Sequence, residues 1–122
     1  MQRDPRAYLW DVQQACERVA RFLDGVGIQR YEADDLVRAA VERQFGIIGE
    51  ALAQLARIEP DMAARVPDCK QIIGFRNVLV HGYASLDNAQ VWRVAQLRLP
   101  ALTAAVDAML ATSGSQADDP AT

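Results

Sequence analysis

Apolar residues recur every three or four positions along most of this chain, and this spacing restricts the possible folds more than any other feature. The longest such segment covers residues 35–57, with apolar side chains at Leu36, Val37, Ala40, Val41, Phe45, Ile47, Ile48, Ala51, Leu52 and Leu55. A period of 3.6 residues places these side chains on one broad face of an α-helix. No segment alternates apolar and polar residues as a half-buried strand does. We therefore predict an all-α protein, an antiparallel bundle of four to five helices.

Capping residues and helix breakers divide the chain into segments. Asp4-Pro5 is typical of a helix start, because aspartate caps the first turn and proline fits the first helical position. Pro100 removes one backbone hydrogen bond and predicts a kink in the last helix. The predicted segments are a first helix from Pro5 that Gly25 and Gly27 end, a connector over 28–33, a long helix over 35–57, one short turn over 61–66, a third main helix over 69–81 and a last helix over 88–110.

Two glycines lie inside the long predicted helix. Gly46 and Gly49 each cost about 1 kcal/mol relative to alanine at such positions. Close contact with another helix is one reason for their presence, and a tight dimer seam is another.

The length and composition indicate a single domain. A chain of 122 residues is long enough to bury one core. We expect the bundle to cover residues 1–111 and a disordered tail to cover 112–122. No apolar run approaches the ~18 residues of a membrane span, and the N-terminus lacks the apolar stretch of a signal peptide, so we expect no membrane and a cytoplasmic protein. Cys16 and Cys69 are isolated, which favours small buried hydrophobes in a reducing compartment.

The charge pattern argues against a broad nucleic-acid-binding surface. The formal net charge is −3, whereas such surfaces are usually basic. Twelve of the thirteen basic residues are arginines, and Lys70 is the exception. Any contact with nucleic acid is therefore expected to be local, at a cleft.

The candidate site is the segment 74–83, Gly-Phe-Arg-Asn-Val-Leu-Val-His-Gly-Tyr, which contains the only histidine. Asn77 and His81, four residues apart, share one face of a helix. Arg76 and His81 are five apart and lie about 140° apart around the axis. One straight helix cannot aim both at a single anion. Either the helix ends near His81, with Gly82 after its last turn, or a second chain completes the site.

Two stretches resemble the HepT-like HEPN toxins. The first is Arg76-x-x-x-x-His81-x-Tyr83, with polar Asn77 directly after the arginine, and the second is residues 35–51, which are similar to the long second helix of that family. The resemblance covers most of residues 4–110. It implies a dimeric all-helical ribonuclease that needs no metal and no cofactor, paired with an MntA-type minimal nucleotidyltransferase antitoxin. It also implies that this partner attaches AMP from ATP to Tyr83 and so inactivates the toxin.

The residues themselves suit such chemistry. Histidine titrates near neutral pH and can take a proton from the 2′-hydroxyl of RNA, and arginine can stabilise the charge that develops on the phosphate. We assign these roles to His81 and Arg76, with Asn77 orienting the imidazole or donating to a phosphate oxygen. Glu50 is a possible supporting residue, by pairing with an arginine of the site or, less directly, in acid–base chemistry.

Structural alternatives exist for each of these residues. His81 can be a helix cap or a core residue, Arg76 can simply pair with Glu50, Asn77 can be a cap, and Tyr83 can pack on the bundle. The second function considered is a non-catalytic helical module that docks a nucleotidyltransferase. A metal-dependent nuclease is disfavoured, since one histidine and scattered carboxylates give no set of ligands at metal-binding spacing.

Overall fold

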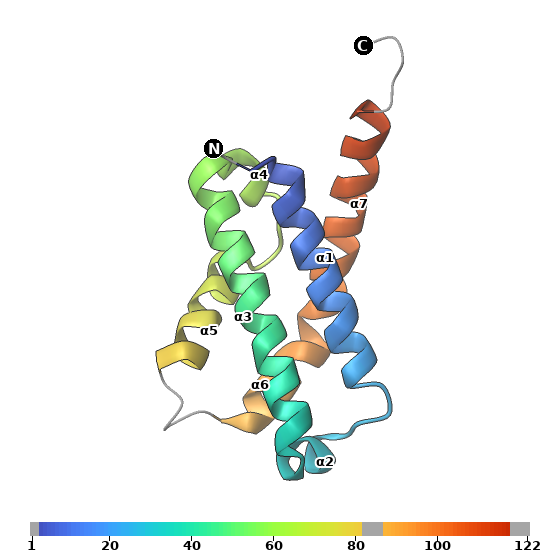
Figure 1. Cartoon of the computed structure of the whole chain (residues 1–122), viewed down its shortest axis with the longest axis vertical. Helices are drawn as coiled ribbons and strands as arrows, with labels where there is room; N and C mark the ends of the chain where they lie inside the picture. Colours follow the sequence, from blue (N-terminus) through green and yellow to red (C-terminus); the bar gives the residue numbers. More distant parts are fainter. Residues whose placement is uncertain (1–2, 82–86, 118–122) are drawn as a thin grey trace.

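The computed structural model describes residues 3–81 and 87–117, and these residues are almost entirely helical, without a strand (Figure 1). The helices are α1 (Pro5–Phe22), α2 (Ile28–Ala33), α3 (Asp35–Ile58), α4 (Pro60–Ala63), α5 (Cys69–His81), α6 (Asn88–Leu97) and α7 (Leu99–Ala117). The predicted all-α class is confirmed.

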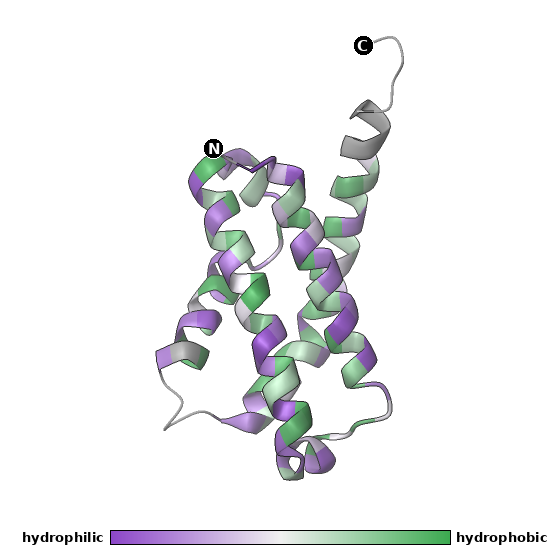
Figure 2. Ribbon diagram, in the orientation of Figure 1, coloured by the Kyte–Doolittle hydropathy of each residue, from purple (hydrophilic) through white to green (hydrophobic). Residues whose placement is uncertain are grey.

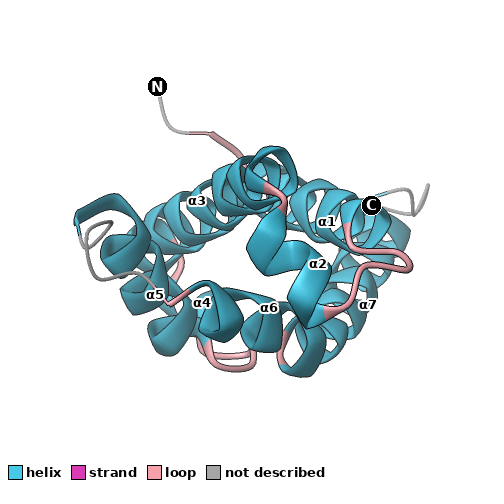
Figure 3. Ribbon diagram, turned by 90° about the horizontal axis from the view of Figure 1, so that it is seen from below, coloured by secondary structure: helices cyan, strands magenta, loops and turns pink. Residues whose placement is uncertain are grey.

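Four long helices run up and down around one core. α1 descends beside α3, which returns in the opposite direction, and α5 and α7 lie on the outer sides of α3 and α1 respectively (Figure 1). Seen from below, α1 and α3 form one layer, and α5, α6 and α7 form the other (Figure 3). The helix α3 thus stands between α1 and α5, and the candidate site lies where it meets α5.

The helix starts follow from side-chain caps. The Asp4 carboxylate accepts a hydrogen bond from the Arg6 amide at 2.9 Å, and Asp34 accepts one from the Val37 amide at 3.1 Å. Each cap satisfies a backbone donor that the first helical turn leaves free. The predicted long helix over 35–57 and third helix over 69–81 agree with α3 and α5 to within one residue.

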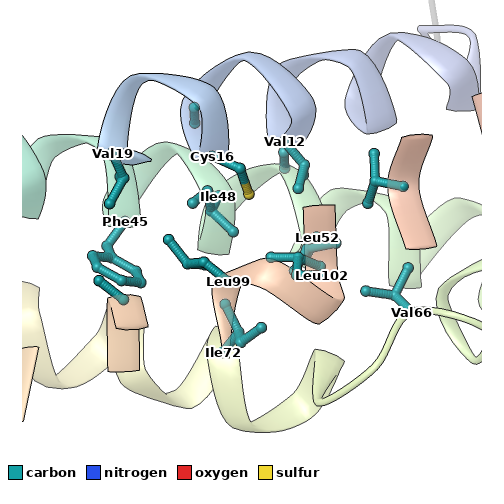
Figure 4. Packing of buried hydrophobic residues seen from close by; sticks show 14 of the residues in the cluster. Val12, Cys16, Val19, Phe45, Ile48, Leu52, Val66, Ile72, Leu99 and Leu102 are labelled. Carbon is teal, nitrogen blue, oxygen red and sulfur yellow. The ribbon is translucent and has the colours of Figure 1, made fainter. Parts of the chain in front are cut away.

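The core is built from the apolar faces of these helices. Figure 4 shows side chains of α1, α3, α5 and α7 meeting in one cluster, and Figure 2 shows hydrophobic and hydrophilic residues mixed along every helix, as amphipathic helices require. Cys16 belongs to this cluster with 2% of its surface exposed, and burial raises the pKa of its thiol to about 11. Cys69 is half-buried and its pKa is also raised by burial. Both cysteines are free thiols packed among apolar neighbours, as predicted.

Three segments of the chain differ from the predictions: residues 28–33, the last predicted helix and the C-terminal tail. The expected connector over 28–33 is the helix α2, whose Tyr31 is fully buried. A segment of six residues is too short to show the 3.6-residue period of a helix, and a single buried aromatic residue does not indicate one. The expected last helix is two helices, α6 and α7, joined at a bend of 44°, so the predicted kink near Pro100 is confirmed in the form of a helix break. The break lies at Arg98, and Pro100 occupies the first turn of α7, where its missing N–H costs little.

The C-terminal helix is also longer than expected. We predicted a disordered tail over 112–122, yet α7 continues to Ala117, and the remainder lies outside the described residues. No proline interrupts the chain between Pro100 and Pro120, so nothing forces the helix to end at residue 111.

Within the described part of the chain, no single helix has both the length and the apolar composition of a membrane span. The bent pair α6–α7 passes that test only when its two halves are joined.

Candidate functional site

The site begins with a close crossing of α3 and α5. Gly49 of α3 is buried, and a methyl group built on it would overlap Cβ of Arg76 and lie 2.6 Å from its Cγ. Any side chain at this position would push α5 away. The predicted close helix contact is therefore confirmed at Gly49. Gly46 makes no such contact within the described residues, because an added Cβ would meet no atom within 4 Å, and a dimer seam there stays a prediction.

Aromatic packing fixes the same crossing one turn away. The rings of Phe45 on α3 and Phe75 on α5 meet edge to face, with centroids 5.3 Å apart and planes at 84°. This is a preferred geometry for aromatic pairs. Together with the buried Ile72, it seats one side of α5 on α3 and turns the side chain of Arg76 toward α3.

The Arg76 guanidinium is held by two oxygen ligands. Its Nη2 lies 3.0 Å from Oε2 of Glu50, and its Nη1 donates to Oδ1 of Asn77 at 3.1 Å. The Glu50 carboxylate also accepts a hydrogen bond from Gln54 Nε2 at 3.1 Å. The ion pair between Arg76 and Glu50, which the sequence left as an alternative, is thus present.

This ion pair orients more than it stabilises. The two side chains are 31% and 51% exposed, and pairs at such exposure contribute about 0–1 kcal/mol because water screens them. The guanidinium is therefore fixed in direction but still reached by solvent. An incoming anion can compete with the carboxylate at low energetic cost.

A surface hollow adjoins this pair. It has a volume of about 340 Å³ and is lined by Arg3, Tyr8, Asp11, Arg43, Gly46, Ile47, Glu50, Ala51, Gln54 and Arg76. These residues come from α1, its N-terminal extension, α3 and α5. Arg43, Ile47 and Glu50 share one face of α3, since they are four and three residues apart. Arg76 thus opens onto a hollow lined by both charged and apolar residues.

His81 lies apart from this cluster. It is the last residue of α5, is exposed, and does not line the hollow. Because α5 is helical from Arg76 to His81, the two residues are about 7.5 Å apart along the axis and about 140° apart around it. The structure brings Arg76, Asn77 and Glu50 together, and His81 is separate. Gly82 and Tyr83 lie outside the described residues.

Sequence reasoning missed the residues that α1 contributes. Arg3 pairs with Asp11 at 2.8 Å and its guanidinium lies 4.8 Å from the centre of the Tyr8 ring. Nothing local relates α1 to α5, so no spacing rule could have found them. The sequence could have indicated Arg43 as a site residue, because it lies seven residues before Glu50 and so on the same helical face.

No group of three or more histidine, cysteine or carboxylate side chains gathers at metal-binding distance within residues 3–81 and 87–117.

Comparison with known proteins relates most of the bundle to one family. The HepT-like ribonucleases match residues 12–109. A candidate RNase of Methanocaldococcus jannaschii, MJ1380, is 28% identical over 107 residues, which cover 86% of this chain and 95% of that protein. Another candidate RNase, TTE0752 of Caldanaerobacter subterraneus subsp. tengcongensis, is 29% identical over 108 residues, covering 88% and 96%.

A third relative carries the family name itself. The protein named probable ribonuclease HepT in Thermococcus cleftensis is 26% identical over 102 residues, covering 84% of this chain and 92% of the relative. No solved structure matches the chain. Since the match spans most of the bundle, including α3 and α5 with their site residues, this chain belongs to the family of HepT-like ribonucleases.

Proposed function

We propose that this protein is a metal-independent endoribonuclease, the toxin of a type VII-like toxin–antitoxin pair. The observation that carries the proposal is the Arg76 guanidinium, oriented by Glu50 and Asn77 at a solvent-reachable hollow within a ribonuclease family fold. A fixed cation that an anion can reach is what phosphodiester cleavage requires. A helix face used only for docking has no need of such an arrangement.

In the proposed reaction, RNA supplies its own nucleophile. His81 takes the proton of a 2′-hydroxyl, and the resulting oxygen attacks the adjacent phosphorus. Arg76 stabilises the additional negative charge on the phosphate oxygens. The bond from phosphorus to the 5′-oxygen breaks, and that oxygen takes a proton from an imidazolium. The products are a 2′,3′-cyclic phosphate and a 5′-hydroxyl.

The reaction needs more than one chain provides. Each chain has one histidine, but base and acid are two roles. The separation of about 140° between Arg76 and His81 also keeps them from one phosphate within a single helix. A two-fold dimer answers both needs, because a second copy of α5 brings another imidazole and another guanidinium to the same cleft.

We further propose that a minimal nucleotidyltransferase partner regulates the enzyme by transferring AMP from ATP to Tyr83. Tyr83 lies two residues past His81 in the sequence. A bulky anion there would compete for Arg76 and repel RNA. A partner of this kind uses ATP, which fits the cytoplasm.

The first experiment measures cleavage of single-stranded RNA by pure protein in the presence of a chelator. We expect cutting by the wild type, with cyclic-phosphate ends, and loss of cutting in His81→Ala with circular dichroism unchanged. Exposed Gln90→Ala on α6 is the control. Full cleavage by His81→Ala would remove the catalytic assignment of His81, and absence of cleavage by the wild type would leave a helical docking module.

The second experiment concerns Tyr83. We expect protein made together with its nucleotidyltransferase to gain the mass of one or more AMP units, and Tyr83→Phe to gain none. Equal masses with and without the partner would contradict the modification.

A further inference from the structure

We propose that the hollow between α1, α3 and α5 is a subsite for the nucleotide next to the cleaved phosphodiester, with Arg43 binding its phosphate and Arg3 supporting its base. This inference rests on the proposed ribonuclease function and extends it to substrate recognition. The volume of about 340 Å³ lies in the range of small-ligand pockets, ~300–1,000 Å³.

The charges of the hollow favour an anion at Arg43. Three arginines and two carboxylates line it, and both carboxylates are already paired, Asp11 with Arg3 and Glu50 with Arg76. Arg43 is exposed, and within the described parts of the chain it has no ion-pair partner. The uncompensated positive charge of the hollow therefore sits on α3 at Arg43.

The position of Arg43 separates it from the catalytic phosphate. It precedes Glu50 by seven residues, which is about 10 Å along α3. Arg43 and Arg76 thus lie at two ends of one hollow. An RNA strand with its reacting phosphate at Arg76 would have a neighbouring phosphate directed toward Arg43.

The N-terminal side of the hollow contains a planar cation, the guanidinium of Arg3. The Arg3 guanidinium lies over the Tyr8 ring, held there by its ion pair with Asp11, and the Arg3 side chain is 50% exposed. Unpaired RNA bases stack on aromatic rings and on guanidinium planes. Arg3, backed by Tyr8, is positioned to receive a base whose phosphate contacts Arg43.

Gly46 keeps the hollow open. It lies in the lining between Arg43 and Glu50, and an added Cβ would meet no atom within 4 Å. In an α-helix the glycine costs about 1 kcal/mol relative to alanine. Packing within the described residues of this chain does not explain this cost, but free space for a ligand does.

The experiment measures binding of a single-stranded RNA whose 2′-oxygens are methylated, so that binding is separated from cleavage. The variants are Arg43→Gln, Gly46→Gln and Arg3→Lys, with Arg30→Gln on α2 as the matched loss of an exposed arginine. We expect Arg43→Gln to raise Kd roughly tenfold and to reduce the slope of log Kd against log salt by about 0.7, the loss of one phosphate contact on a single strand.

The other variants separate shape from charge. Gly46→Gln should weaken binding by filling the hollow while thermal stability is kept or increased, a combination that a damaged fold would not give. Arg3→Lys keeps the positive charge but removes the planar guanidinium. RNA binding should therefore weaken while the slope of log Kd against log salt stays unchanged. Arg30→Gln should bind like the wild type.

Each failure has its own signature. Unchanged Kd in both Arg43→Gln and Gly46→Gln would overturn the subsite and leave the ribonuclease proposal intact. RNA binding that depends on Arg43, without cleavage by the wild type, would overturn the catalysis and support the subsite. Absence of RNA binding by the wild type would overturn both.

Discussion

The two glycines of α3, three residues apart, have opposite surroundings. Gly49 faces the first side-chain atoms of Arg76, and Gly46 faces open space. Gly49→Ala should lower the free energy of unfolding, because an overpacked contact costs about 1–3 kcal/mol and exceeds the helix-propensity gain of about 1 kcal/mol. Gly46→Ala should raise it by up to about 1 kcal/mol. Urea denaturation of the two variants measures both changes, and equal effects would contradict the difference in packing.

A half-buried carboxylate gives the stability a pH dependence. Burial raises the pKa of Glu42, with Arg38 opposing the shift. A raised folded-state pKa means that the native state takes up the proton more readily than the unfolded state. The resulting penalty is fully present above the folded pKa and is lost as pH falls to the ordinary carboxylate range, near about 4.3.

Glu42→Gln should therefore raise the Tm at pH 7, and this gain should shrink as the pH falls toward about 4. The exposed Glu17→Gln on α1 is the control and should show no such trend. Scanning calorimetry over this pH range makes the comparison. A gain that grew toward acid would reverse the sign and contradict the assignment.

At the scale of elements, α5 depends on one main neighbour. It packs on α3 through the Phe45–Phe75 pair and the Gly49–Arg76 contact. Phe75→Leu removes an aromatic pair worth about 0.5–1.5 kcal/mol beyond its buried area. Hydrogen exchange should then quicken in α5 more than in α1 or α3, since local opening needs only this interface. Phe22→Leu, a half-buried phenylalanine of α1, should not single out α5.

How far the sequence predicted these elements depends on how local their causes are. The causes of α1 and α3 lie within their own residues: the start at Pro5, the cap at Asp34 and the period of apolar residues. The bounds of α3 could therefore be predicted to one residue. The contact of Gly49 with Arg76 depends on how two helices cross, which no spacing along the chain specifies. For the same reason Arg3 and Tyr8 were not foreseen at the site, although Arg76, Asn77 and Glu50 were expected there.

At the scale of the whole molecule, the proposed dimer can be tested by mixing subunits. His81→Ala chains should be inactive alone. Since the proposed reaction uses the imidazoles of both chains, only dimers of two wild-type chains are active, and a refolded equimolar mixture of wild-type and His81→Ala chains should show about a quarter of the activity of wild-type dimers at the same total concentration. If each site came from a single chain, about half of that activity would remain. Ultracentrifugation of the same samples establishes whether they are dimers.

The crossing at Gly49 also constrains how such a protein can change over generations. A larger residue there must displace α5, since Cβ and Cγ of Arg76 occupy the space, and the arginine then leaves its place beside Glu50. A descendant with a bulky residue at position 49 is therefore expected to be under no selection to keep a guanidinium at position 76, and a comparison of inherited pairs at these two positions would record that loss.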